Sequence, residues 1–307
     1  MNKHKKIAVV TGGAGFIGSN LAAELVAHDF EVRIIDTLVN GKRENVPTAA
    51  VLYEVDILNT VACTKIMEGA NSVFHLAALP RVSYSVDHPL ESNRVNVEGT
   101  ISVLVAARDA MVGKVVYSAS GSTYGNQETI PYHEELPATP VNPYGLQKYI
   151  GELYLKIFSG IYGLSTVSLR YFNVYGPHMD PGGPYGLAVA KFLEQRAKGG
   201  PLTIVGDGTQ TRDFTHVRDV VRANLLAMNS AKVGRGEVIN IGTGKNVTVN
   251  YLADLIDGGM GPRKTLPPRV EAHDSCADNT RAKELLGWEP TISLEDGIAE
   301  LKKEFNL

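Results

Sequence analysis

The stretch Tyr144-Gly145-Leu146-Gln147-Lys148 holds two residue types that together can move a proton. If Pro143 opens a helix, Tyr144 and Lys148 stand at positions i and i+4 and project from one face as neighbours. Ionising a tyrosine at pH 7 costs roughly 4 kcal/mol, because its ordinary pKa is about 10. An ammonium about 4 Å away, at an effective dielectric constant of about 20, supplies a similar amount. The pair can therefore act as a general base.

Ser120 is a candidate third member of this site. Its hydroxyl can orient a substrate oxygen and donate to the anion that develops on it. The pattern Tyr-x-x-x-Lys is weak by itself, because an exposed helix turn with a solvated lysine produces it as well. The rest of the sequence has to decide between these two interpretations.

A glycine-rich turn follows the first apolar segment. Ile7 to Val10 has the composition of a short buried parallel strand, and Gly12, Gly15 and Gly18 come next. These glycines permit a tight turn and close approach of a pyrophosphate to backbone N–H groups. The second predicted strand ends in Asp36, 18 residues beyond Gly18, near the spacing expected for a carboxylate that binds ribose hydroxyls. Such a carboxylate would repel a 2′-phosphate, which favours NAD over NADP; a structural turn with a capping Asp is the alternative.

Strands and helices alternate through the first half of the chain. Further strands are predicted at 51–55, 73–76 and 114–120, and helices at 89–111 and 143–162. This alternation indicates an α/β fold with a doubly wound, Rossmann-type parallel sheet. His75 lies in an apolar run and is expected to be a core histidine rather than a catalytic one. Of Asn93 and Asn96 within the helix 89–111, one is expected to brace a loop at the cofactor, and solvent exposure is the alternative for Asn93.

Composition excludes several other classes of protein. The 307 residues are 44% apolar and 21% charged with a net charge of −3, as in an ordinary globular protein without a basic nucleic-acid footprint. Cys63 and Cys276 are too few for a disulfide framework, and no metal-binding spacing occurs, so we expect no protein-built metal site. No apolar run is long enough for a membrane span or a signal peptide, and the cytoplasm is the expected location.

Several motifs taken together resemble the extended short-chain dehydrogenase/reductase family. They are Thr11-Gly12-x-x-Gly15-x-x-Gly18, Asp36, Ser120, Tyr144-x-x-x-Lys148 and the stretches 169–177, 206–217 and 283–290. The resemblance covers nearly the whole chain and is greatest to nucleotide-sugar 4-epimerases of the UDP-galactose 4-epimerase type. It implies an NAD-binding Rossmann domain of residues 1–172 plus 214–243. Residues 173–213 plus 244–307 would form a smaller, interleaved α/β substrate domain.

The resemblance also implies a role for each candidate. Tyr144 would be the acid/base, Lys148 would lower its pKa and hold the nicotinamide ribose, and Ser120 would bind the sugar O4. Hydride would leave C4 for NAD⁺, and the 4-keto sugar would turn over and be reduced on its other face, so that NAD stays bound. The expected NAD contacts are Gly12, Gly15, Phe16, Ile17, Gly18, Asp36, Asn40, Gly41, Asp56, Ile57, Leu76, Ala77, Ala78, Asn96, Ser118, Tyr144, Lys148 and Tyr171.

The expected substrate contacts are Ser120, Ser122, Asn173, Arg212, Arg269 and Ser275. The two arginines would neutralise a UDP diphosphate, although Arg212 could equally pair with Asp213 on the surface. Arg269 departs from the family's Arg-Pro-Gly-Asp/Glu pattern, because Val270-Glu271 follows it. Ser275 resembles a size gate beside the sugar C2 substituent, where a small residue admits UDP-GlcNAc and UDP-GalNAc as well as plain hexoses; it could also merely line a loop.

Three further expectations rest on the resemblance. Ser120-Gly121-Ser122 stands where 4,6-dehydratases carry Thr-Asp-Glu, which disfavours that elimination chemistry. UDP-glucuronate 4-epimerisation, with Arg81 as the nearest cation for a C6 carboxylate, remains an alternative to the UDP-hexose reaction, and a non-catalytic NAD-binding protein is a third. A homodimer is expected through the helices near 90–112 and 143–162.

Overall fold

A computed structural model describes residues 5–181, 187–267 and 272–307 of the chain. Its centre is a seven-stranded parallel sheet in the order β11-β6-β5-β4-β1-β2-β3. The strands are β1 (Ile7–Thr11), β2 (Glu31–Ile35), β3 (Val51–Tyr53), β4 (Ser72–His75), β5 (Lys114–Ser120), β6 (Thr166–Tyr171) and β11 (Arg235–Ile241). The run from β3 through β1 to β6 has the strand order of a dinucleotide-binding doubly wound sheet. The predicted fold class is therefore confirmed.

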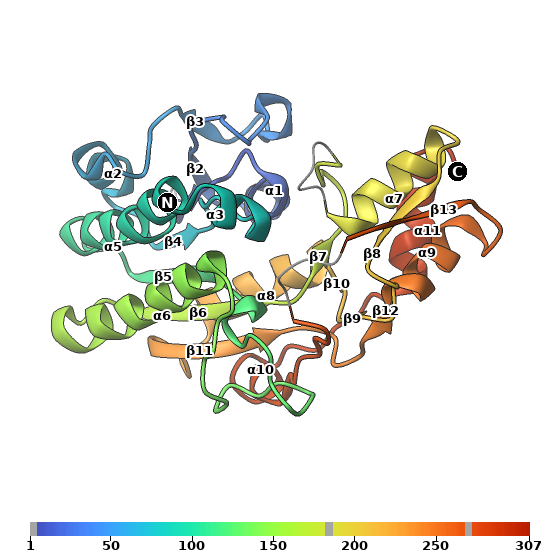
Figure 1. Ribbon diagram of the computed structural model, residues 1–307. Coiled ribbons are helices and arrows are strands. Elements are labelled where there is room, and N and C mark those ends of the chain that lie inside the picture. The colour runs from blue at the N-terminus through green and yellow to red at the C-terminus, as the bar shows by residue number, and fades with distance from the viewer. Residues whose placement is uncertain (1–4, 182–186, 268–271) are drawn as a thin grey trace.

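Helices cover both faces of this sheet, as Figure 1 shows. On one face, α1 (Phe16–Ala27), α8 (Val217–Asn229) and α10 (Thr280–Leu286) share a core with the strands. On the other, α2 (Thr60–Met67), α5 (Gly99–Asp109) and α6 (Pro143–Tyr162) do the same. The alternation of side chains along a strand divides β1 between the two cores, because Ala8 and Val10 pack on one side and Val9 on the other.

The helix α6 begins and ends where its sequence predicts. Asn142 caps the N-terminus, its side chain accepting a hydrogen bond from the Gly145 N–H, and Pro143 occupies the first turn. Gly163 ends the helix in the left-handed conformation, with φ 68°. These two ends fix the register that places Tyr144 and Lys148 on the face toward the sheet.

The segment predicted as one long helix at 89–111 is helical throughout but not uniform. It consists of α4 (Pro89–Asn93), a π-helical turn (Arg94–Glu98) and α5, and α3 (Val82–Asp87) precedes it. The π-helical turn contains Asn96, whose buried side chain hydrogen-bonds the backbone of Leu79. A turn of this kind often marks a functional site.

A second group of elements lies beside the sheet, at the right of Figure 1. It holds three two-stranded sheets: β7 (Val174–Tyr175) with β10 (Thr215–His216), β9 (Thr211–Arg212) with β12 (Val247–Thr248), and β8 (Leu202–Val205) with β13 (Arg263–Leu266). With them are α7 (Ala188–Ala197), α9 (Val249–Asp257) and α11 (Leu294–Glu304), which share a core of their own. The split into two interleaved domains stays a prediction, and α10 with Trp288 packs in the core of the large sheet although the sequence assigned it to the substrate part.

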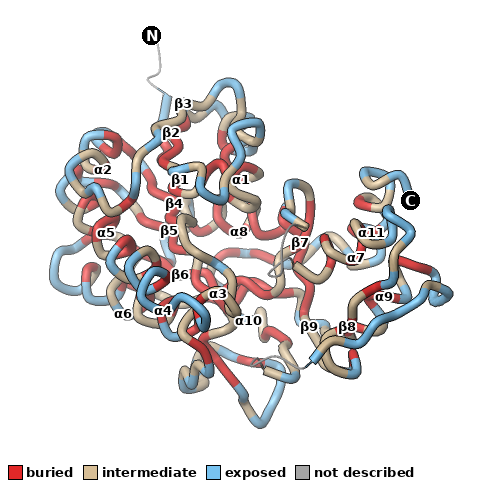
Figure 2. Tube along the Cα trace, turned by 45° about the horizontal axis from the view of Figure 1, so that its top comes forward, coloured by how far each residue is buried: buried red, intermediate tan, exposed pale blue. Residues whose placement is uncertain are grey.

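Burial follows the sheet. Figure 2 shows the strands β1, β4, β5 and β6 buried, while the outer turns of α2 and the chain around α9 are exposed. Among the described helices, none combines the length and the apolar character needed to cross a bilayer.

Candidate active site

A cavity of about 1210 Å³ lies between the two groups of elements. One part of its wall comes from the C-terminal ends of β1, β2, β4 and β5, where parallel sheets of this kind bind ligands. Another part comes from β8, β9 and the segment around Ser275. A ligand that fills this cavity touches residues separated by most of the length of the chain.

The glycine turn after β1 has no room for a side chain at Gly12 or Gly18. Gly12 has φ +70°, and a Cβ there would lie 2.8 Å from the Ala77 nitrogen. A Cβ on Gly18 would overlap the Gly12 carbonyl oxygen. The turn therefore brings backbone N–H groups of the α1 N-terminus to the cavity surface, which suits a pyrophosphate.

Asp36 stands at the end of β2 with its carboxylate fixed in place. Its Oδ2 accepts a hydrogen bond from the Ala14 N–H at 3.0 Å and its Oδ1 one from the Leu38 N–H at 2.8 Å. Each oxygen keeps a lone pair for a ribose hydroxyl. Together with the glycine turn, this carboxylate fits an NAD molecule.

Nearly all of the predicted cofactor residues line this one cavity. They are Gly12, Gly15, Phe16, Ile17, Gly18, Asp36, Asn40, Gly41, Asp56, Ile57, Leu76, Ala77, Ala78, Ser118, Tyr144, Lys148 and Tyr171. Asn96 is not among the lining residues. It is 2% exposed and holds the cavity loop by binding both the N–H and the carbonyl of Leu79, at 2.7 and 3.1 Å. Asn96 thus braces the loop and does not line the cavity itself.

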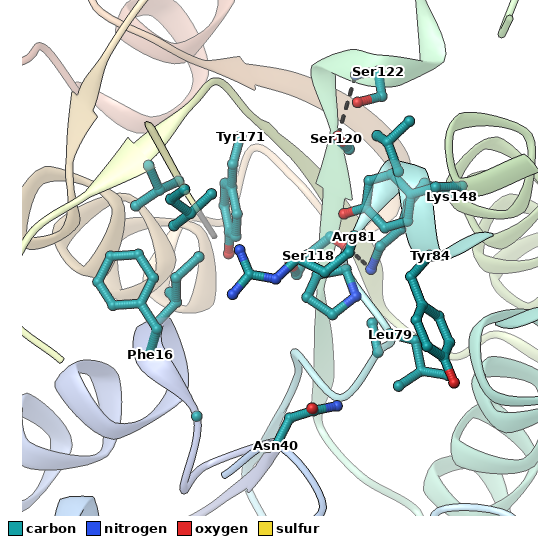
Figure 3. Close-up of a pocket in the computed structure, with 18 of the residues that line it drawn as sticks. Phe16, Asn40, Leu79, Arg81, Tyr84, Ser118, Ser120, Ser122, Lys148 and Tyr171 are labelled. Atoms are coloured by element: carbon teal, nitrogen blue, oxygen red, sulfur yellow. Dashed lines mark hydrogen bonds between the residues drawn. The ribbon is translucent and has the colours of Figure 1, made fainter. Parts of the chain in front are cut away.

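The three catalytic candidates meet where β5 faces α6. Lys148 is 2% exposed and its ammonium donates to the Ser118 carbonyl at 2.7 Å. Its Nζ lies 5.9 Å from the centre of the Tyr144 ring. The Ser120 hydroxyl accepts a hydrogen bond from the Ser122 N–H at 3.2 Å, and its interaction with the Tyr144 side chain acts to lower the pKa of that phenol. Figure 3 shows Ser118, Ser120 and Lys148 along one wall of the cavity.

The electrostatics of this wall differ from the simple expectation. Burial raises the pKa of Tyr144 to about 12, and the hydrogen bond of Ser120 and the charge of Arg81 only partly oppose it. Burial also lowers the pKa of Lys148 to about 7, against the charge of Glu152. In the protein alone, burial thus raises the pKa of Tyr144 and lowers that of Lys148, because removing these groups from water disfavours both the phenolate and the ammonium.

Arg81 is a second cation at this wall. It lines the cavity, and in Figure 3 its guanidinium extends into the open space toward Tyr171. Burial lowers the pKa of Arg81, while the charges of Asp180 and Tyr144 raise it. The cavity thus carries a positive group close to the phenol and distinct from Lys148.

The substrate candidates Ser120, Ser122, Asn173, Arg212 and Ser275 line the same cavity, and Arg269 lies outside the described residues. Backbone carbonyls fix Arg212, whose Nη1 donates to those of Thr211 at 2.8 Å and His273 at 2.9 Å. Asp213 is fully buried and accepts hydrogen bonds from the backbone of residues 243, 244 and 277. A surface ion pair between Arg212 and Asp213 is therefore excluded.

Other polar contacts around the site had no local signal in the sequence. Ser19 on α1 lies 2.9 Å from His178 (Oγ to Nδ1), and Asn20 donates to the Pro177 carbonyl at 3.0 Å. These contacts hold the segment that follows β7 against α1, the helix that starts at the glycine turn. His75 is a core residue as predicted: it is 1% exposed, it lies within hydrogen-bonding distance of Thr11 and Thr100, and burial lowers its pKa to about 3.

Comparison with known proteins identifies the family. The sequence profile of the NAD dependent epimerase/dehydratase family matches residues 8–242. The chain belongs to this family. Its cofactor is NAD, in agreement with the glycine turn and Asp36, and the predicted resemblance is confirmed.

Close relatives cover the whole chain. The UDP-glucose 4-epimerase of Mycolicibacterium smegmatis is 39% identical over 312 residues, 97% of each chain. The crystal structure of the Thermotoga maritima UDP-glucose 4-epimerase with UDP-glucose is 41% identical, covers 98% of each chain and has a TM-score of 0.93. A UDP-N-acetylglucosamine 4-epimerase from Methanobrevibacter ruminantium, in complex with UDP-N-acetylmuramic acid, is 35% identical, covers 99% of each and has a TM-score of 0.93.

Proposed function

We propose that this enzyme interconverts C4 epimers of UDP-sugars, with Tyr144 as the acid/base. The observation that carries the proposal is the convergence of Tyr144, Lys148 and Ser120 on the cavity that also holds the dinucleotide turn and Arg212. One ligand seated on the turn and another seated on Arg212 would meet at the phenol. The relatives that act on UDP-glucose and UDP-N-acetylglucosamine support this reaction class.

The chain's own residues handle the proton. Tyr144 takes the proton of the sugar O4, and Ser120 orients that oxygen by donating a hydrogen bond. Lys148 places a positive charge beside the phenolate. NAD⁺, when bound, supplies the acceptor and then the donor of a hydride, together with a positive ring charge. This positive charge would favour the phenolate form of Tyr144, whereas burial in the protein alone raises the pKa of Tyr144 and keeps it protonated.

Inversion at C4 requires the sugar to present its second face within the same site. We propose that the sugar turns within this cavity of about 1210 Å³ while the diphosphate stays held. A bound NAD is returned to its starting state by each epimerisation, so it does not need to leave.

Recognition of the nucleotide sugar is proposed for Asn173, Arg212, Arg269 and Ser275. The carbonyls of Thr211 and His273 hold the guanidinium of Arg212 at the cavity wall, where it can meet a diphosphate. Ser275 is a small residue on that wall, which supports acceptance of an N-acetyl group at C2. We therefore include UDP-GlcNAc and UDP-GalNAc among the substrates.

A second candidate substrate is UDP-glucuronate, and Arg81 favours it. The guanidinium lies close enough to Tyr144 for its charge to act on the phenol, and a C6 carboxylate is attached to the ring carbon next to C4. This would use the same chemistry on a different sugar. It predicts that Arg81→Ala selectively weakens turnover of the uronate.

The decisive experiment is incubation of the purified protein with UDP-glucose, UDP-GlcNAc and UDP-glucuronate, followed by separation of the C4 epimers. We expect epimers of the first two sugars to form without added NAD. Failure of all three sugars to react in protein that contains NAD would refute the proposal.

We also propose a homodimer built on α6. Leu146, Leu153, Ile157 and Ile161 form an exposed apolar stripe along it, and Val86 and Leu90 of α3 and α4 are exposed as well. A second copy of the chain would cover both surfaces about a two-fold axis. Leu153→Glu with Ile157→Glu should yield a monomer by light scattering; an unchanged mass would refute the interface.

A further inference from the structure

Behind Lys148, the helix α6 carries a third ionisable side chain on the same face. Tyr144, Lys148 and Glu152 follow one another at intervals of four residues. Along the axis, Glu152 is therefore about 6 Å from Lys148 and about 12 Å from Tyr144. Glu152 is 3% exposed and Lys148 is 2% exposed, so little water screens the carboxylate from the ammonium. Glu152 acts on Lys148 much more strongly than on Tyr144.

Arg170 of β6 forms a buried ion pair with Glu152 that favours the ionised carboxylate. Its Nε and Nη2 donate to the two carboxylate oxygens at 2.8 and 2.7 Å, and its guanidinium lies over the Tyr124 ring, 4.5 Å from the centre. Burial raises the pKa of Glu152, and the hydrogen bonds and charge of Arg170 oppose this, followed by the charge of Lys148. Without Arg170, a carboxyl in this position would tend to take up a proton and lose its charge.

Stability is a poor explanation for this buried pair. Replacing a buried ion pair with apolar side chains of similar volume is often neutral or stabilising, because both charges lose their hydration. The position of Glu152, one helical turn after Lys148, is therefore the observation that points to a role in the active site. Groups with strongly perturbed pKa values gather where chemistry needs them.

The proposed reaction requires that Lys148 carry a proton while Tyr144 is ionised. In the active arrangement Tyr144 is a phenolate and Lys148 an ammonium; in the inactive one they are a phenol and an amine. Passage to the inactive form breaks an N–H bond on Lys148 and makes an O–H bond on Tyr144, with no net proton exchanged. The balance is therefore independent of pH and depends on the difference between the two pKa values. Burial favours the inactive arrangement, because it raises the pKa of Tyr144 and lowers that of Lys148.

We propose that Glu152, held ionised by Arg170, is a positioning residue that keeps the shared proton on Lys148 and the negative charge on Tyr144. The inference rests on the roles proposed above for Tyr144 and Lys148. Glu152 is the group whose charge opposes the effect of burial on Lys148.

The other groups around Lys148 do not fulfil this role. They are Tyr144 on α6, Tyr117 on β5 with its ring 4.8 Å away, and His75 on β4, which burial keeps neutral with its pKa at about 3. Arg81 acts on Tyr144 from the cavity side and lowers its pKa. Among the described groups around Lys148, Glu152 is the one that supplies a negative charge.

The test compares wild-type holoenzyme with Glu152→Gln and with the double variant Glu152→Gln/Arg170→Met, which removes both charges. A loss of one pKa unit at Lys148 should shift the proton balance about tenfold, so we expect kcat to fall about tenfold or more across the whole pH plateau. The acid limb of the profile, which follows the Lys148 pKa when the phenol and amine form predominates, should move about one unit to lower pH, and the alkaline limb should stay in place. KM for the UDP-sugar and the amount of bound NAD should not change.

A matched control separates this effect from lost stability. Asp219 is 1% exposed and pairs with Arg222 at 2.8 Å, away from the cavity lining. Asp219→Asn/Arg222→Met should lower the melting temperature without changing the pH profile. The conservative variants Glu152→Asp and Arg170→Lys retain the charges, and we expect them to keep most of kcat and the wild-type pH profile. If the neutral variants do not fold, a loss of kcat in these charge-retaining variants as large as tenfold would count against the role of the charge.

Wild-type kcat and an unmoved acid limb in folded variants of Glu152 would overturn the inference, as would a loss no greater than that of the control. Tyr144→Phe is assayed in parallel. If it stays active, the proposed function itself fails; if it is inactive while the Glu152 variants are normal, only the role of Glu152 is refuted.

Discussion

The two walls of the cavity are built in different ways. On the β5–α6 wall, Ser120, Tyr144 and Lys148 stand on regular elements of the large sheet, and Lys148 is almost fully buried. On the opposite wall, Arg212 belongs to a two-residue strand and is held by backbone carbonyls, while Ser275 lies outside any helix or strand. Rigid elements fix the atoms that react, and short strands and loops hold the groups that would select the sugar. The difference predicts that variants of the first wall lose rate and variants of the second lose affinity or selectivity.

The largest effect is expected for Tyr144→Phe. Removing the hydroxyl removes the acid/base but leaves the ring and the NAD contacts, so kcat should fall about 10³-fold or more while NAD remains bound. Stopped assays of epimer formation, together with the nucleotide content of the purified variant, measure both quantities. Activity within tenfold of wild type would show that another group moves the proton.

Lys148→Met should lower kcat about 10²-fold, because the phenolate loses its neighbouring charge.

The same variant also tests the burial of Lys148 through its effect on stability, measured by thermal unfolding of nucleotide-free protein. The folded pKa of about 7 lies below the ordinary value of 10.5, so between these values the unfolded chain binds more protons and wild-type stability rises with pH. Below pH 7 the folded protein carries the full cost of a buried ammonium. The variant should therefore gain most over wild type at pH 6, and the gain should vanish above pH 10.5.

Arg212→Lys tests the second wall. A lysine keeps the charge but cannot present a planar fork to a diphosphate. We expect KM for the UDP-sugar to rise about tenfold with kcat within a factor of about two, which initial-rate kinetics will resolve. A loss confined to kcat would place Arg212 with the reacting atoms and would remove the contrast between the walls.

The smallest effect on the plain hexose is expected for Ser275→Tyr. A phenol ring in place of a hydroxymethyl group should reduce kcat/KM for UDP-GlcNAc by about tenfold or more and leave UDP-glucose nearly unaffected. The ratio of the two specificity constants is the measurement. Equal activity in wild type and variant would remove the size-gate assignment.

The contrast between the walls also decides what the sequence could predict. The glycine turn, Asp36 and the limits of α6 depend on local rules, namely backbone conformation, strand–helix alternation and capping by Asn142 and Gly163, so each could be predicted. The pairing of Arg170 with Glu152 joins different elements across 18 residues, and nothing local specifies it. The position of Glu152 two turns after Tyr144, on the face toward the sheet, was the one available signal.

The electrostatics of the site depend on burial for a related reason. The expectation that Lys148 lowers the Tyr144 pKa assumed partly solvated groups about 4 Å apart. The fold buries both groups, and this burial raises the pKa of Tyr144 and lowers that of Lys148. Burial is a property of the whole packed structure, so spacing along one helix could not predict it.

The most direct test of the central claim uses a UDP-hexose labelled with deuterium at C4. The account predicts that the purified enzyme forms the C4 epimer and that the label stays on C4, since the hydrogen removed from that carbon returns to it while Tyr144 handles only the O4 proton. Product that has lost its deuterium to solvent, or no epimer at all from protein with bound NAD, would contradict it.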